Sequence, residues 1–230
     1  MNMRKETDHP AIIARYGKKI RTSALFHGMS DGELEKAFEI LRAEFSSYDK
    51  GEYLHLPYTQ MKMFGMVLSG VVQACMDDIE GSRMIMAEVV PGGTFGESLC
   101  FLAETESPVY VSASEPSEVL WFSVGELFGE PRDAFAVRLE KQFTAMLASR
   151  TLSMNDRIQV LSKIRLRDKI TTYFSQMSQQ TRSLTFQIPM NRDDFATYMG
   201  TNRSALSREL ARMKKEGLID YYRNTIRILG

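Results

Sequence analysis

The spacing of apolar residues changes twice along this chain, and each change restricts the folds that it can adopt. Residues 8–45 carry apolar side chains every three or four positions, as amphipathic helices do. Between residues 46 and 122 the period shortens to two, in short runs separated by turns that contain glycine. After Ser123 the helical period returns. Helices on either side of a group of short strands predict an α+β fold.

The strands between residues 46 and 122 are expected to form a β-roll or jelly roll. No helical segment is expected between them to make the crossovers that a parallel sheet needs. Ahead of them, Ser30 is a suitable helix N-cap and Glu33 stands three residues further on. We therefore expect a short helix that begins near Ser30 and packs on the strands.

A helix much longer than average is expected to begin near Arg132, because residues 132–185 contain neither glycine nor proline. Its apolar side chains recur at helical spacing, at Phe135, Leu139, Phe143 and Met146. The roll can cover only one side of such a helix, and isolated helices are marginally stable. The sequence therefore predicts a homodimer through this helix, although Arg150 and Ser153 interrupt a regular apolar seam.

Residues 190–210 have the pattern of a helix-turn-helix. Asn191 can cap the first helix, and acidic residues at 193 and 194 suit its positive end. Gly200 can adopt the backbone conformation of the turn, and Asn202 can cap the second helix. The second helix would bury Leu206 and Leu210. Its outer face would display hydrogen-bonding side chains suited to a DNA major groove, namely Arg203, Ser204, Ser207 and Arg208.

The segment that follows predicts a wing. Residues 218–229 alternate in polarity about Asn224, as the two strands of a hairpin do. Together with residues 184–188 this hairpin would form a small sheet. The carboxy-terminal part of the chain is therefore expected to be a winged helix-turn-helix.

The net charge of zero conceals an asymmetry between the two ends of the chain. Residues 1–160 contain 16 Lys and Arg against 23 Asp and Glu, whereas residues 161–230 contain 13 against 6. Attraction to phosphates is long-ranged, and acidic groups oppose it. An acidic body with a basic end therefore favours double-stranded DNA as the partner of residues 161–230.

Nearly the whole chain resembles the bacterial transcription regulators typified by the cyclic-AMP receptor protein and the fumarate–nitrate regulator. The most specific motifs are Pro-Gly-Gly-Thr-Phe-Gly-Glu-Ser at residues 91–98 and Arg-Ser-Ala-Leu-Ser-Arg at residues 203–208. The resemblance implies a cyclic-nucleotide-binding-like β-roll with N-terminal helices over residues 1–130. It implies a dimerisation helix with its hinge over residues 131–161, and a winged helix-turn-helix over residues 162–230. It also implies a homodimer on a palindromic operator, with RNA polymerase as a further partner of an activator.

The same resemblance assigns roles to residues of the second helix and its surroundings. It implies that Arg203 and Arg208 read guanine, which an arginine can do through two hydrogen bonds. Arg192 matches a contact with the DNA backbone, which positions the protein without reading sequence, and Asn202 is placed with it. Ser204 stands where many members carry a base-reading glutamate, so the operator sequence stays open. Ser207 completes the base-reading set.

The β-roll is not expected to bind cyclic AMP. Members that do so pair Gly-Glu with Arg-Ser or Arg-Thr ten residues further on, whereas here Gly96-Glu97 is followed by the uncharged Ser107-Pro108. A buried phosphate would lack its cationic partner. We therefore expect either a small organic effector or none. Residues that would meet an effector, by the resemblance, are Gly96, Glu97, Ser98, Ser107, Pro108, Arg150, Met154 and Asn155.

Two alternatives remain for the regulatory input. One is a DNA-binding regulator that acts without an effector. The other is a haem or redox sensor, in which His27, His55, Cys75 or a methionine would hold the haem. An iron–sulfur cluster of the fumarate–nitrate type is not expected, because no cysteine precedes Cys75.

Composition excludes several other classes. The three histidines show no metal-ligand spacing and no nucleophile–base pair stands out, so neither an enzyme nor a resident cofactor is expected. Cys75 and Cys100 lie far apart without a CxxC motif, which suits a reducing compartment. No run reaches the roughly 18 apolar residues of a membrane span, and residues 1–10 are polar rather than signal-like. We therefore expect a cytoplasmic protein with no membrane partner.

Overall fold

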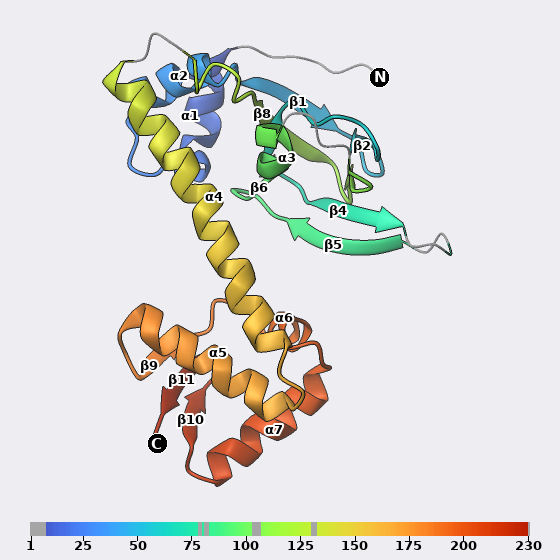
Figure 1. Ribbon diagram of the computed structural model, residues 1–230, viewed down its shortest axis with the longest axis vertical. Helices are drawn as coiled ribbons and strands as arrows, with labels where there is room; N and C mark the ends of the chain where they lie inside the picture. Colours follow the sequence, from blue (N-terminus) through green and yellow to red (C-terminus); the bar gives the residue numbers. More distant parts are fainter. Residues whose placement is uncertain (1–7, 78–79, 81–82, 103–106, 130–132, 230) are drawn as a thin grey trace. The chain divides into compact units, whose positions relative to one another are not determined.

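The computed structural model describes residues 8–77, 80, 83–102, 107–129 and 133–229 of the chain (Figure 1). The chain divides into two compact units, Met1–Ala148 and Ser149–Gly230. The boundary between them falls within the helix α4 (Ala134–Leu161). The three-part division expected from the sequence, with boundaries after residues 130 and 161, stays a prediction.

Two short helices open the first unit. Helix α1 (His9–Ile20) begins at Asp8, whose side chain accepts a hydrogen bond from the amide of Ala11. Helix α2 (Asp31–Ile40) begins with the predicted capping box, in which the Ser30 and Glu33 side chains each accept a hydrogen bond from the other residue's amide. These bonds satisfy amide groups that a helix start leaves unpaired. Each helix buries one apolar face, through Ile12, Ile13, Tyr16 and Ile20 in α1 and Leu34, Ala37 and Phe38 in α2.

Two four-stranded sheets form the body of the first unit (Figure 1). The first sheet has the order β1-β8-β3-β6, and its strands are Glu44–Tyr48, Ser117–Phe122, Phe64–Ser69 and Thr94–Phe95. The second has the order β2-β7-β4-β5, and its strands are Tyr53–His55, Tyr110–Ala113, Val72–Asp77 and Arg83–Val89. Neighbouring strands pair antiparallel in both sheets. This arrangement confirms the predicted β-roll.

One helix interrupts the strands, contrary to the expectation that none lies between residues 46 and 122. Helix α3 (Glu97–Leu102) directly follows β6 and a glycine turn. Gly96 in this turn has a φ of 81°, and a Cβ atom there would lie 2.1 Å from the Sδ of Met61, so the position requires glycine. A helix of six residues has fewer than two turns, too few to establish a helical period in the sequence.

The first unit has two apolar cores. The larger joins the N-terminal helices and the first half of α4 to the first sheet. Its centre is a group of packed rings whose centroids lie 5.1 to 6.0 Å apart, formed by Phe26, Phe38, Phe64 and Phe122. The smaller core contains residues from both sheets and therefore fills the space between them, with Val67, Val72, Val111 and Trp121 among its members.

Helix α4 is 28 residues long and changes character along its length. Asp133 receives a hydrogen bond from the amide of Ala136 at 2.8 Å at its start, and the predicted start at Arg132 lies outside the described residues. The first half buries Leu139, Phe143 and Met146 in the larger core. The second half exposes Leu152, Met154 and Ile158 by 65%, 65% and 61%. An apolar helix face in water lacks the tertiary packing that stabilises most helices.

The second unit has the predicted winged-helix arrangement. After α4 come α5 (Leu166–Thr181), β9 (Thr185–Gln187), α6 (Arg192–Tyr198), α7 (Arg203–Lys215), β10 (Ile219–Tyr222) and β11 (Thr225–Ile228). The three strands form an antiparallel sheet in the order β10-β11-β9. One apolar core joins these helices to the sheet, with Phe174, Phe195, Leu206, Leu210 and Ile226 at most 2% exposed.

Across the described ranges, no helix combines the length and the apolar character that crossing a membrane requires. Even α4 carries charged side chains along its length, Arg138, Glu140 and Arg157 among them.

Candidate nucleic-acid interface and effector site

The turn between α6 and α7 forms as the sequence predicts. Asn191 caps α6, and its side-chain oxygen accepts hydrogen bonds from the amides of Asp193 and Asp194 at 2.9 Å each. Gly200 adopts a φ of 65° in the turn, a left-handed conformation that favours glycine. Ala196 is 2% exposed, so only a small side chain lies in the core where the two helices meet.

Helix α7 presents the four predicted base-reading residues to solvent. Asn202 caps the helix and accepts a hydrogen bond from the amide of Ala205 at 2.9 Å. Leu206, Leu210 and Met213 anchor it in the core at 0%, 1% and 2% exposure. The spacing of these anchors fixes which positions face outward. The exposed set includes Arg203, Ser204, Ser207 and Arg208, and their contacts with bases stay a prediction.

The exposed side chains of α7 differ in what holds them. The guanidinium of Arg203 forms an ion pair with Asp193, with 2.8 Å between Nη1 and Oδ2. The Ser204 hydroxyl donates a hydrogen bond to the side-chain oxygen of Asn202 at 2.7 Å. Arg208 forms neither an ion pair nor a side-chain hydrogen bond with any described residue. In the absence of DNA, the two arginines expected to read bases therefore differ: Arg203 is ion-paired, and Arg208 has no such partner among the described residues.

Arg192, the expected backbone contact, is joined to the wing. One of its N–H groups donates a hydrogen bond to the carbonyl of Arg223 at 2.8 Å. The Arg192 guanidinium and the Lys214 ammonium lie 5.6 and 5.2 Å from the ring centroid of Tyr221. Lys214 also pairs with Asp220 at 2.6 Å, and this hydrogen bond raises the pKa of Lys214. These contacts connect the start of α6 to the hairpin.

The wing offers residues that the sequence analysis did not single out. Tyr222 is 74% exposed, and the guanidinium of Arg223 lies 5.5 Å from its ring centroid. Arg223 has a φ of 52° at the hairpin turn, where it precedes Asn224. The sequence signal that could have identified these residues is Tyr-Tyr-Arg-Asn at the predicted turn. Exposed aromatic and basic side chains at such a turn are suited to binding a polyanion.

Arg167 joins helix α5 to helix α7 and its C-terminal cap. Its Nε lies 2.6 Å from Oε1 of Glu209, and Nη1 and Nη2 lie 2.5 and 3.0 Å from the two carboxylate oxygens of Glu216. Hydrogen bonds to Glu216 and Glu209 raise the pKa of Arg167, and the bond from Arg167 lowers the pKa of Glu216. Glu209 and Glu216 lie 42 and 49 positions from Arg167 in the sequence, so no local motif indicates these ion pairs.

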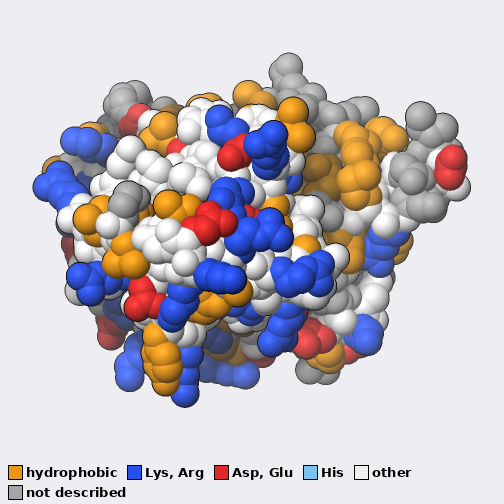
Figure 2. All heavy atoms as spheres, turned by 90° about the horizontal axis from the view of Figure 1, so that it is seen from below, with side chains coloured by type: hydrophobic (Ala, Val, Ile, Leu, Met, Phe, Trp, Pro, Cys, Tyr) orange, Lys and Arg blue, Asp and Glu red, His pale blue; other side chains and the backbone are white. Residues whose placement is uncertain are grey.

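Figure 2 shows a face of the molecule over which Lys and Arg side chains are spread, with fewer Asp and Glu side chains between them. The excess agrees with the count for residues 161–230, which contain 13 Lys and Arg against 6 Asp and Glu. A positive surface attracts a polyanion over distances longer than any single contact.

The predicted effector residues are divided between the two units. Gly96, Glu97 and Ser98 lie at the start of α3, where Glu97 is 1% exposed and Ser98 is exposed. Ser107 is 9% exposed and Pro108 is exposed. The Ser107 hydroxyl and carbonyl accept hydrogen bonds from the amides of Val109 and Tyr58, respectively. All five belong to the first unit.

The other three predicted effector residues lie on α4. Arg150, Met154 and Asn155 belong to the second unit and are exposed. The single effector site expected from the sequence therefore stays a prediction.

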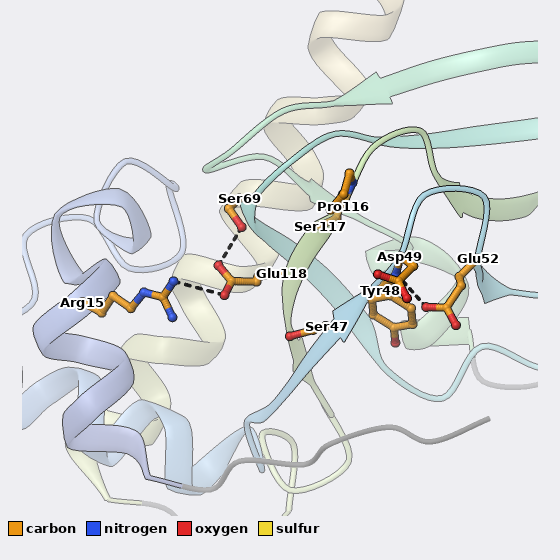
Figure 3. A pocket seen from close by; sticks show the side chains of 9 residues that line it. All are labelled: Arg15, Ser47, Tyr48, Asp49, Glu52, Ser69, Pro116, Ser117 and Glu118. Carbon is orange, nitrogen blue, oxygen red and sulfur yellow. Dashed lines mark hydrogen bonds and ion pairs between the residues drawn. The ribbon is translucent and has the colours of Figure 1, made fainter.

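A cavity of about 750 Å³ lies on the first unit, next to Arg15 of α1 and along the first sheet (Figure 3). Its lining is mostly polar and includes none of the predicted effector residues; it consists of Arg15, Ser47, Tyr48, Asp49, Glu52, Ser69, Pro116, Ser117 and Glu118. Arg15 and Ser69 reach different carboxylate oxygens of Glu118, at 3.2 and 2.6 Å (Figure 3). The hydroxyl of Tyr16 also donates to Glu118. These partners lie 103, 49 and 102 positions from Glu118, which is why sequence reasoning missed them.

The charge state of Glu118 follows from these contacts. Burial raises the pKa of its carboxyl, but hydrogen bonds from Ser69 and Tyr16 and the charge of Arg15 outweigh burial and lower the pKa overall. Glu118 is therefore ionised at neutral pH and already has partners for both carboxylate oxygens.

The candidate haem ligands lie in different environments. His27 is exposed, and His55 is half-buried with a pKa lowered by burial. Cys75 is fully buried, and its Sγ accepts a hydrogen bond from Nε of Arg83 at 3.1 Å. Among the described residues, no three His, Cys, Asp or Glu side chains form a group that could hold a metal ion.

Two protein families match parts of this chain. Residues 45–132 match the cyclic nucleotide-binding domain, and residues 168–230 match the Crp-like helix-turn-helix domain. The first match covers the β-roll, and the second covers the winged helix.

Full-length relatives match as well. The cyclic AMP receptor protein of Thermus thermophilus is 26% identical over 212 residues, which cover 91% of this chain and 94% of that protein. The transcriptional regulatory protein btr of Bordetella pertussis is 22% identical over 88% of this chain and 84% of that protein.

Solved structures share the fold. The Thermus thermophilus catabolite activator protein matches with a TM-score of 0.50 and 24% identity, covering 90% of this chain and 93% of that one. The c-di-GMP responsive regulator CLP of Xanthomonas campestris matches with a TM-score of 0.51 and 18% identity, covering 87% of this chain and all of that one.

The order of the elements, the exposed polar face of α7 and the two family matches agree with one another. The relatives are transcription regulators rather than enzymes. The chain belongs to the superfamily of bacterial DNA-binding transcription regulators that includes the cyclic-AMP receptor protein and the fumarate–nitrate regulator.

Proposed function

We propose that this chain regulates transcription as a homodimer that reads a palindromic operator through Arg203, Ser204, Ser207 and Arg208. The observation that carries the proposal is the first two turns of α7, where these four side chains are exposed while Leu206 and Leu210 hold the helix in the core. Arginine and serine on an exposed helix offer the donors and acceptors that base edges in a major groove require. Arg192 and Asn202 would contact the DNA backbone, and RNA polymerase would be a further partner of an activator.

Selection of bound duplexes from a random pool tests the operator. The expected result is a palindrome with guanines in two half-sites, spaced by about one helical turn of 34 Å. Binding that depends on salt but not on sequence would contradict the proposal, since phosphate attraction alone behaves in this way.

The second half of α4 supports the dimer. Met154 and Ile158 lie four residues apart, and Leu161 follows at helical spacing, so the three share one face. Their side chains are 65%, 61% and 39% exposed in the single chain. A second copy of the same helix would cover this face.

Sedimentation of Ile158→Glu tests the dimer. A charge on the apolar face should shift the protein toward monomer and weaken operator binding. Ser149→Glu adds the same charge to an exposed position on the opposite side of the helix, because it lies nine residues, about two and a half turns, before Ile158, and it should remain dimeric. A wild-type protein that is monomeric at working concentrations would overturn the proposal.

The proposed regulatory input is a small organic molecule other than cyclic AMP. Support comes from Ser107 and Pro108, which stand where a cyclic phosphate would need a cation. Effector binding would shift the population between settings of the two winged helices, only one of which fits both half-sites.

Thermal unfolding with cyclic AMP tests this input. A ligand that binds only the folded protein raises the unfolding midpoint by mass action, so cyclic AMP is expected to leave the midpoint unchanged. A midpoint that rises with cyclic AMP would contradict the proposal. If operator affinity does not respond to any metabolite that binds the roll, the regulator acts without an effector.

A further inference from the structure

The two arginines expected to read guanine are held differently, although they lie on one helix face. Arg203 forms an ion pair with Asp193 of α6, whereas Arg208 has no such partner among the described residues. Both side chains are exposed. The difference therefore comes from Asp193 and not from burial.

The ion pair is of little value for stability. The side chains of Arg203 and Asp193 are 65% and 64% exposed, and solvent-exposed pairs contribute little to folding. Its geometry has a different consequence. A guanidinium carries five N–H groups in a planar fork, and the carboxylate occupies only Nη1, at 2.8 Å. The remaining N–H groups are enough for the two hydrogen bonds to O6 and N7 of guanine.

Asp193 is itself held in place. Its amide donates a hydrogen bond to Asn191 at 2.9 Å, and it lies in the first turn of α6, where the helix dipole favours a carboxylate. The backbone of Asp193 is therefore fixed at the start of α6, and its carboxylate gives the Arg203 side chain a partner ten residues away in the sequence.

We propose that Asp193 is a specificity-determining residue, which positions the guanidinium of Arg203 for a base edge and disfavours contacts of Arg203 with phosphates. This inference rests on the proposed function. Without the carboxylate, Arg203 can turn toward the DNA backbone, and contacts with phosphate carry no sequence information. The negative charge of Asp193 beside the DNA also opposes binding to every sequence alike. The first effect raises the ratio of specific to non-specific affinity, whereas the second weakens both affinities equally.

The chain supplies a matched control in Asp194. It is the next residue, carries the same charge, and its amide also donates to Asn191 at 2.9 Å. Its carboxylate makes no ion pair with a described residue. Asp193→Asn and Asp194→Asn in the full-length protein therefore remove equal charge from the same helical turn.

The experiment compares both variants with the wild type on the selected operator, with each of the four bases at the positions read by Arg203 and Arg208. A bidentate arginine–guanine contact discriminates on the order of 5- to 150-fold. Asp193→Asn should reduce the guanine preference at the Arg203 position to a few-fold and leave the Arg208 position unchanged. Asp194→Asn should leave both preferences unchanged. Each variant should bind a non-specific duplex more tightly than the wild type.

A second measurement separates positioning from a general loss of structure. In an Arg203→Ala background, Asp193→Asn should have no effect on base preference at either position, because there is no guanidinium left to position. An equal loss of preference at both positions in the single variant would overturn the proposal.

The outcomes also separate the inference from the function on which it rests. If the wild type shows no base preference, the proposed function and the inference both fail. If the wild type prefers guanine at the Arg203 position and Asp193→Asn keeps that preference, only the role of Asp193 fails.

Discussion

The two units of this chain differ in where their candidate functional polar groups lie. In the second unit the candidate residues stand on the outside of one helix, exposed and close together in the sequence, from Arg203 to Arg208. In the first unit, Glu97 and Ser107 are 1% and 9% exposed, on segments joined through residues outside the described ranges. A surface that reads DNA can be built from one helix. A site that encloses a small molecule needs several segments, and its residues are correspondingly dispersed.

The largest expected effect tests whether the two units are stabilised separately. Leu206 and Leu34 are both fully buried, one in each unit. Leu206→Ala should destabilise the second unit by about 2 to 5 kcal/mol, because it leaves a cavity in the core. Leu34→Ala should do the same to the first unit. Urea unfolding followed by hydrogen exchange should assign each loss of stability to one unit. A loss of stability spread equally over both units would contradict separate stabilisation.

The next effect concerns base reading in the second unit. Arg203→Ala or Arg208→Ala should each cost about 1 to 3 kcal/mol of operator binding and remove the preference for one base. Lys215→Ala on the same helix removes an equal charge outside the predicted reading face and should keep every preference. Binding to duplexes with single base changes, at one salt concentration, measures this. A preference that survives in both arginine variants would contradict the reading face.

A smaller and different effect is expected for Arg192. Its replacement by alanine should weaken binding to all sequences alike and reduce the slope of log affinity against log salt by about 1, since one phosphate contact is lost. The measurement is a salt titration on the operator and on an unrelated duplex. A change confined to the operator would place Arg192 among the base-reading residues.

The smallest effect lies in the first unit and depends on pH. Hydrogen bonding to the Ser30 amide, and then to Arg138, lowers the pKa of Glu33 from 4.5 to about 2. A carboxyl whose pKa is lower in the folded state stabilises the fold above its unfolded pKa, and the contribution is lost as the pH falls toward 2. Glu33→Gln should therefore flatten the stability of the first unit between pH 4.5 and 2. An unchanged acid transition would contradict the role of this capping box.

The elements that the sequence predicted well are those whose signals lie in adjacent residues. Ser30, Asn191 and Asn202 each precede a helix and accept hydrogen bonds from its first amides, as their residue type and position indicated. Gly200 marked the turn, and Asn224 marked the hairpin. In each case the physical cause lies within a few residues of the signal.

What the sequence did not predict depends on distant partners or very short elements. Helix α3 is too short to show a period. Arg167 meets Glu209 and Glu216 only after the chain has folded back over more than forty residues. The pairing of Asp193 with Arg203 depends on how α6 and α7 cross. The sequence shows that the two residues carry opposite charges, but it does not show that their side chains are in contact.

Two cations lie near the ring of Tyr221, and one of them, Arg192, also donates a hydrogen bond to a carbonyl of the hairpin turn. The position of the Arg192 guanidinium is thus coupled to the shape of a loop that follows it by about thirty residues. Under the proposed phosphate contact of Arg192, lengthening that loop by one residue would displace the Arg223 carbonyl and move the guanidinium away from the DNA backbone. Affinity for every sequence would then fall through a change in a residue that itself makes no proposed contact with DNA.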